Sequence, residues 1–135
     1  MSLAQYAAVR MAIAAALKTI SGLSVHKEEP DTVPQWPFAI LGNGTIEYGT
    51  DMGGGQNTSF KLFLAVREAD SEHGFEMLDD FLAASGAKSV PATLEAASIG
   101  NGFLLVTRAE NIGHVRYREV TWIGAEFIIQ VQSGG

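Results

Sequence analysis

The chain has 135 residues, no cysteine, and nine Lys and Arg against fifteen Asp and Glu, which gives a formal net charge of −6. A chain of this length forms one domain, here 1–135, and can bury a hydrophobic core without cross-links. The absence of cysteine excludes disulfides and thiolate metal sites, and the negative charge argues against a general nucleic-acid-binding protein. The longest apolar run, 11–17, is too short to span a bilayer, so we expect no membrane segment.

The N-terminal region predicts one helix followed by an irregular segment. Large apolar residues recur every three or four positions over 3–20, which indicates an amphipathic helix ending at Ser21 and Gly22. The next segment, 23–37, contains three prolines and a run of charged residues. It therefore predicts at most a short strand at 23–25, followed by an extended loop.

Strand patterns occupy the next part of the chain. Two short apolar runs, 38–41 and 45–48, are separated by the Gly-Asn-Gly of 42–44. Asn-Gly between apolar runs predicts a β-hairpin. The polar, glycine-rich segment 49–57 follows as a loop, and 58–67 is β-branched and aromatic enough to form a buried strand.

A second helix is predicted from a cap at Asp70 or Ser71 to Ala84. Its apolar side chains share one face and are Phe75, Leu78, Phe81 and Leu82. Its carboxylates lie mostly elsewhere and are Glu72, Glu76, Asp79 and Asp80. The simplest interpretation of these carboxylates is a solvated face, and the alternative is a surface that repels DNA.

The last third of the chain predicts a short helical turn and two strands. The turn covers 89–96 with Ser89 as its cap, and the strands cover 103–109 and 116–132 with 110–115 as the loop between them. The more apolar face of the last strand consists of Thr121, Ile123, Ala125, Phe127, Ile129 and Val131. This order of elements predicts an α+β fold, a largely antiparallel β-sheet with the two main helices packed on one face.

No pattern in the sequence indicates chemistry. The histidines are His26, His73 and His114, and the nearest approach to a metal site is His73 with Glu76, which together do not close a coordination sphere. The glycine clusters at 42–44 and 53–55 are not followed by the Gly-Lys-Ser/Thr of a phosphate-binding loop, and no nucleophile elbow is present. We therefore expect no catalytic residue, no metal and no cofactor.

Three groups of residues are candidates for an interface. Trp36 lies in the irregular segment, where it either fills the local core or anchors a partner. Arg108, Arg116 and Arg118 are the only basic concentration. The last two would point to one side of a strand, toward a partner's carboxylates or a phosphate, although an exposed strand face whose charges protect the edge is the simpler interpretation. The glycine-rich loop can become ordered against a partner, and its candidates are Asp51, Gly53, Gly54 and Gly55.

The order of these pieces resembles the small tail-terminator (tail-completion) proteins of long-tailed bacteriophages and prophages. The resemblance covers most of the chain and lies in element order and small-residue spacing. Its marks are the helix ending in LKTISGL (17–23), the proline-spaced loop leading to Trp36-Pro37-Phe38-Ala39, the run 44–48 with its polar loop and strand, the helix around 75–82, the SVPATLE turn (89–95), and the terminal strand 117–131.

The resemblance implies a virion-assembly protein rather than an enzyme. Six copies would close into a ring at the head-proximal end of the tail, cap the tail tube, stop tail-tube polymerisation and present a joining surface to the head-side neck or connector protein. DNA would pass through the lumen without specific binding, and assembly would take place in the host cytoplasm. The alternatives are another neck or head–tail joining protein and, in a different class, a small-ligand-binding α+β domain that uses the histidines.

Overall fold

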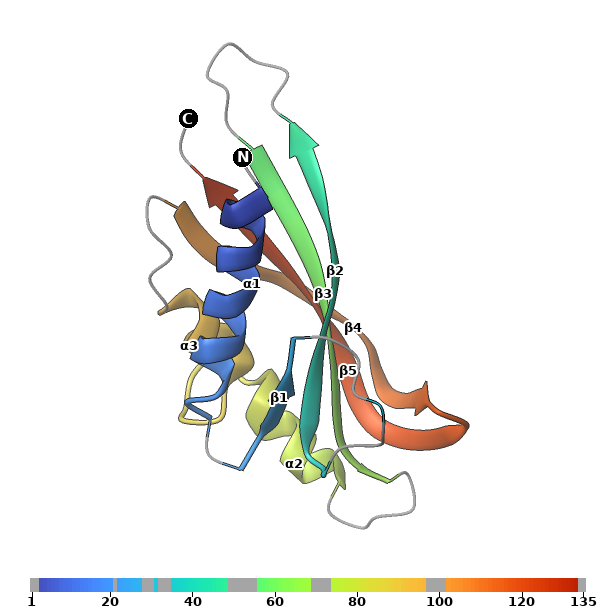
Figure 1. Cartoon of the computed structure of the whole chain (residues 1–135). Helices are drawn as coiled ribbons and strands as arrows, with labels where there is room; N and C mark the ends of the chain where they lie inside the picture. Colours follow the sequence, from blue (N-terminus) through green and yellow to red (C-terminus); the bar gives the residue numbers. More distant parts are fainter. Residues whose placement is uncertain are drawn as a thin grey trace.

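Three helices cover one face of a five-stranded sheet in this computed structural model, which describes residues 3–20, 22–27, 31, 35–48, 56–68, 74–96 and 102–133 (Figure 1). The predicted α+β fold, with its helices on one face, is confirmed. The elements in chain order are α1 (Leu3–Leu17), β1 (Ser24–His26), β2 (Phe38–Tyr48), β3 (Gln56–Glu68), α2 (Gly74–Leu82), α3 (Val90–Glu95), β4 (Gly102–Tyr117) and β5 (Val120–Ser133).

The strands are ordered β1-β2-β3-β5-β4 across the sheet. β1 runs parallel to β2, and the three remaining pairs, β2–β3, β3–β5 and β4–β5, are antiparallel. The sheet is therefore antiparallel except for the three-residue strand β1 at one edge. The predicted short strand near Leu23 is confirmed as β1.

The main core lies between the helices and the sheet. The predicted alternation in the last strand is confirmed, because Ile123, Ala125, Phe127, Ile129 and Val131 are all buried while Thr121, at the turn, is exposed. The helices contribute buried apolar side chains to the same cluster, among them Ile13, Leu17, Leu78, Phe81, Val90 and Leu94. Burial of such side chains removes apolar surface from water and is the main stabilising contribution in a domain of this size.

The predicted hairpin at 42–44 is wrong. β2 is one strand, and its register against β3 shifts between Leu41 and Gly44, so that Gly-Asn-Gly forms a bulge. Arg10 of α1 donates hydrogen bonds to the carbonyl oxygens of Gly42 (2.8 Å), Leu41 (3.4 Å) and Lys27. The bulge thus turns carbonyls toward a guanidinium that fixes α1 and the segment after β1 to the edge of the sheet.

The predicted loop at 110–115 is also wrong, because these residues continue β4. The chain reverses instead at Arg118 and Glu119, which have φ of 50° and 67°. β4 carries bulges between Val106 and Arg108 and between Glu110 and Gly113, and these bend the strand where the sequence suggested a loop.

The helix ends differ from the predictions only in detail. α1 ends at Leu17 and continues as turns to Ile20, and α2 is shorter than predicted at Gly74–Leu82. Phe75, expected on the buried face, is exposed, while the cap candidates Asp70 and Ser71 lie outside the described residues. The predicted cap of the short third helix is confirmed, since the hydroxyl of Ser89 accepts a hydrogen bond from the N–H of Ala92 at 3.0 Å.

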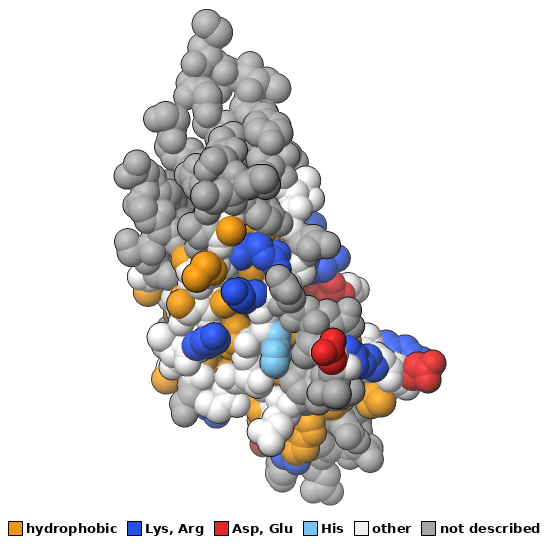
Figure 2. Space-filling model, viewed as in Figure 1, with side chains coloured by type: hydrophobic (Ala, Val, Ile, Leu, Met, Phe, Trp, Pro, Cys, Tyr) orange, Lys and Arg blue, Asp and Glu red, His pale blue; other side chains and the backbone are white. Residues whose placement is uncertain are grey.

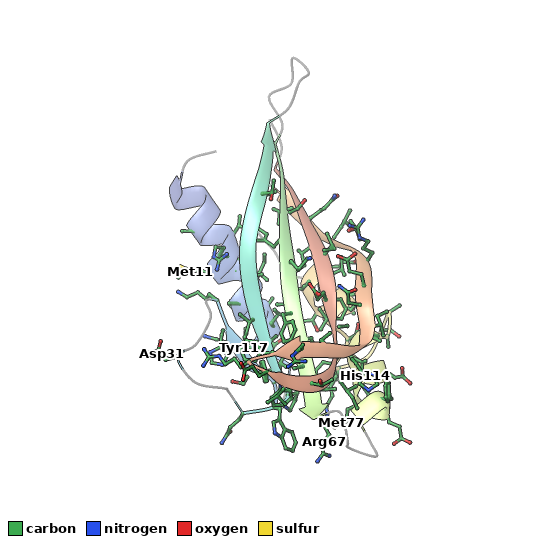
Figure 3. The ribbon with its side chains drawn as sticks, turned by 90° about the vertical axis from the view of Figure 1, so that its right-hand side faces the viewer. Met11, Asp31, Arg67, Met77, His114 and Tyr117 are labelled. Atoms are coloured by element: carbon green, nitrogen blue, oxygen red, sulfur yellow. The ribbon has the colours of Figure 1, made fainter. Side chains whose placement is uncertain are left out.

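The end of the β4–β5 hairpin, residues 113–124, curls across the face of the sheet that carries no helices (Figure 3). We call this hairpin segment the hairpin end and the helix-free face the open face. Gly113 and Gly124 face each other in the register where the curl begins. A Cβ on Gly124 would lie 2.0 Å from the carbonyl oxygen of Leu64, so only glycine allows β5 to approach β3 this closely.

Candidate interaction surface

A cluster of aromatic rings fixes the hairpin end to the sheet. Phe38 of β2 contacts Trp122 edge-on with ring centroids 5.3 Å apart, and it contacts Tyr117 at 5.5 Å. Phe63 of β3 lies 5.6 Å from the same Tyr117 ring. Such ring contacts stabilise the packing beyond the burial of the rings alone. They hold the hairpin end against the sheet as an ordered surface.

Trp36 stands beside this cluster without entering it. Its side chain is 43% exposed, and the guanidinium carbon of Arg67, at the end of β3, lies 4.6 Å from the centroid of its ring. The Trp36–Pro37 peptide bond is cis, and Pro37 leads directly into the buried Phe38. Of the two roles predicted for Trp36, filling the local core is wrong, because nearly half of the side chain faces solvent against a cation.

The three candidate arginines do not form one patch. Arg118 is in the turn and not on the strand, so it does not share a strand face with Arg116 as predicted. It donates a hydrogen bond to the carbonyl oxygen of Asp31 at 2.6 Å, and its guanidinium carbon lies 5.4 Å from the Tyr117 ring centroid. Arg108 pairs with Glu110 at 3.5 Å. Arg116 is exposed on β4.

The open face beyond the hairpin end carries a mixed-charge network. Lys61 of β3 pairs with Glu126 at 3.3 Å and with Glu110 at 3.8 Å, and Asn111 donates to Glu126 at 2.8 Å. Together with Arg108 these side chains contribute two positive and two negative charges. A shallow hollow of about 430 Å³ adjoins the network and is lined by Thr45, Ser59, Phe60, Lys61, Thr107, Arg108, Ile128 and Gln130.

The helix side of the molecule carries a group of acidic side chains on α2. Figure 2, which has the same view as Figure 1, shows basic and apolar side chains interspersed with a few acidic ones on the side where α1 and β1 lie. The carboxylates of α2 that the structure describes, Glu76, Asp79 and Asp80, are exposed, as predicted for a solvated face. Because they are spaced three and four residues apart, these carboxylates share one side of α2.

The two histidines that the structure describes, His26 and His114, lie on separate strands, β1 and β4. His26 shares a hydrogen bond of 3.0 Å with the hydroxyl of Ser24, while His114 contacts the exposed Phe75 ring edge-on at 5.7 Å. His73 and the loop candidates Asp51, Gly53, Gly54 and Gly55 lie outside the described residues. Among the residues that are described, no three His, Asp or Glu side chains are grouped as they would be around a metal ion, and no helix is long and apolar enough to cross a membrane.

Sequence reasoning missed three residues that build these surfaces. Arg10 looked like an interruption of an apolar helix, yet it binds the bulge of β2. Lys61 interrupts an apolar strand, and its alternation with the apolar Leu62 was the available signal that one face of that strand is polar. Nothing in the sequence pairs Arg67 with Trp36, because the contact joins residues from two separate elements.

No family model and no curated protein matches the chain. Solved structures do match it, among them a chain from the structure described as "Virion of native gene transfer agent (GTA) particle". The alignment covers 99% of this chain and 100% of the other, with a TM-score of 0.62 and 18% sequence identity. At this identity the likeness shows that the two chains share a fold over their whole length.

Proposed function

We propose that the chain is a structural component of a phage-like virion and that it acts there as a tail terminator. The observation that carries the proposal is the whole-length fold match to a chain of a gene transfer agent virion. The element order and small-residue spacing of the sequence, which resemble tail-terminator proteins, support the more specific role. The fold match supports a virion structural protein, and the sequence resemblance alone supports the role of tail terminator.

In the proposed role, six copies form a ring that caps the tail tube, stops its polymerisation and presents a joining surface to the head-side neck. This role requires surfaces and no reaction, so the proposal assigns no enzymatic activity. A closed ring needs two different surfaces on each copy, because a rotation brings one side of each copy against the other side of its neighbour.

The described surface offers residues suited to such contacts. Trp36 presents an exposed aromatic ring beside Arg67, and these are residue types that contribute strongly to protein interfaces. Their position next to the aromatic cluster matters, because a packed support holds an anchor in place before the partner arrives. We assign the contact with the tail tube or the neck to this end of the molecule.

Light scattering and negative-stain imaging of the purified protein, alone and mixed with purified tail tubes, test the proposal. We expect rings at one end of the tubes and tubes that no longer lengthen. W36A should reduce tube binding, whereas M11A, which removes another exposed large apolar side chain from α1, should not. A protein that stays monomeric and unbound in the presence of tubes would refute the role.

A second candidate is another neck or head–tail joining protein. The same observation supports it, because the matched structure is described as a virion and the description names no position within the particle. The two candidates differ in the partner that they bind. Binding to isolated heads and not to tail tubes would select the joining protein over the tail terminator.

A further inference from the structure

The β2 edge of the sheet is blocked along its first half. β1 pairs with Phe38–Ile40, and the Arg10 guanidinium takes the next carbonyls, those of Leu41 and Gly42. Strand edges covered in this way cannot accept a further strand. Beyond this covered part, residues 45–48 continue as strand, and among the described residues no strand pairs with them on that side.

The β4 edge, at the other side of the sheet, is blocked from Val106 onward. The N–H of Val106 donates to the Glu95 carboxylate of α3 at 3.4 Å. Two bulges and the charged Arg108 and Glu110 follow, and these are features that prevent edge strands from pairing. Residues 102–105 precede all of them, and within the described part of the chain only β5 pairs with that segment.

The two open segments occupy the same four rows at the same end of the sheet. Across the strands, Thr45 is in register with Leu105 through Ser59 and Gln130. Tyr48 is likewise in register with Gly102 through Gln56 and Ser133. The open segments therefore have the same length and lie at the same level along the strand direction.

The two segments also match in direction. Three successive antiparallel pairings separate β2 from β4, so these strands run in opposite directions. A rotation about an axis along the strands places β4 of one copy beside β2 of the next as a further antiparallel pair. Neither segment contains Lys or Pro, the residues that commonly protect exposed edges, Glu47 is the single charged residue in the two segments, and Leu105 is 39% exposed.

We infer that residues 45–48 of one copy pair with residues 102–105 of a second copy, so that the sheets of neighbouring copies join. The occupant of each open edge is the other edge of an identical chain, a head-to-tail contact in which main-chain hydrogen bonds continue the ladder. The inference rests on the proposed assembly of copies into a ring and names the surface by which they assemble.

Cysteine cross-linking tests this pairing, because the chain has no cysteine of its own. In antiparallel pairs the Cα atoms lie about 4.5–5.5 Å apart, within the range of about 4.4–6.8 Å that a disulfide spans. T45C/L105C places one thiol on each edge in the same row. E47C/L105C tests the adjacent register, since a stagger of two residues keeps the side chains on matching faces.

At concentrations where the unmodified protein assembles, mild oxidation should convert one of these double variants into a ladder of covalent multimers on a non-reducing gel. M11C/V120C is the matched control, because both of its side chains are exposed and neither lies in an open segment. It should remain monomeric on the gel. The single variants T45C, E47C and L105C should form no more covalent multimer than this control.

The outcomes separate this inference from the proposed function. Rings that form without cross-linking above the control would overturn the strand pairing and leave the tail-terminator role standing. Efficient dimers from T45C or L105C alone would show that like edges pair and would also overturn it. A protein that stays monomeric alone and with tail tubes would overturn both.

Discussion

Replacing Gly124 by alanine tests whether the close approach of β5 to β3 determines the shape of the domain. The φ of Gly124 is not in the left-handed region, so the added methyl group causes no backbone strain of its own. Taken alone, replacing glycine by alanine stabilises a protein by about 0.4–1 kcal/mol, because alanine lowers the conformational entropy of the unfolded chain. The methyl carbon, however, would lie 2.0 Å from the carbonyl oxygen of Leu64 and 3.0 Å from a methyl of Val115.

The clash involves backbone of a neighbouring strand, which cannot rotate away as a side chain can. Inserting a methyl group into a packed site of this kind costs about 1–3 kcal/mol, and the contact with Leu64 places Gly124→Ala at the upper end, about 3 kcal/mol. With an unfolding entropy of about 2.1 cal/mol/K per residue over 135 residues, this corresponds to a fall in Tm of about 10 °C. Thermal unfolding followed by circular dichroism measures it.

Gly22→Ala is the matched control. Gly22 has φ of +83° and nothing within 4 Å of the added carbon, so its substitution introduces backbone strain without a clash. We expect a loss of about 1 kcal/mol there, or about 4 °C. A Gly124→Ala variant as stable as the unmodified protein, or more stable, would refute the close approach on which the curl of the hairpin end depends.

Substitutions at three further positions test the surfaces described above. Tyr117→Phe should leave the free energy of urea unfolding unchanged or raise it by up to about 1 kcal/mol, because the buried hydroxyl has no hydrogen-bond partner among the described residues; a clear loss would reveal a partner. Arg10→Met should lower that free energy by about 2 kcal/mol, and Arg10→Lys should restore little of it because an ammonium cannot reproduce the guanidinium fork. Trp36→Ala should lower stability by less than about 1 kcal/mol, the value of an exposed cation–π contact, while tube binding falls; a variant that binds tubes normally would exclude Trp36 as an anchor.

The fold class could be predicted because one face of the sheet is buried and the sequence records this burial. The alternation from Ile123 to Val131 and the cap at Ser89 follow from local rules, and both are confirmed. Local rules failed where a distant residue decides the conformation. Gly42-Asn43-Gly44 satisfies the pattern of a hairpin turn, but Arg10, more than thirty residues away, binds the carbonyls that a bulge exposes there.

The interface candidates show the same limit. Trp36 could be identified from its residue type and its position among prolines, whereas its partner Arg67 could not, since a cation–π contact leaves no pattern along the chain. The grouping of Arg116 with Arg118 failed because the turn lies later than predicted. Two non-glycine residues with positive φ form that turn, and nothing in their sequence marks them as turn residues.

The thickness of the two layers indicates which face of the sheet turns toward the axis of the proposed ring. Helices about 10 Å across cover one face of the sheet only, and this layer needs room beside the same layer of the neighbouring copies. The outer side of a ring has the larger circumference and so offers that room. The open face would therefore face the axis. Beyond the hairpin end its described charges, Lys61 and Arg108 against Glu110 and Glu126, balance, and the carboxylates of α2 would lie outside.

This orientation predicts a lumen wall that is neutral and hydroxyl-rich beyond the hairpin end, so that DNA would pass without acidic side chains repelling its phosphates. Q130C places a thiol on the open face, and D79C places one on the exposed side of α2. Ring assembly should slow the reaction of Q130C with a bulky polymer maleimide, relative to the dissociated protein, and should leave the D79C rate unchanged. The reverse pattern would mean that the helices face the axis and that the acidic side chains of α2 line the path of the DNA.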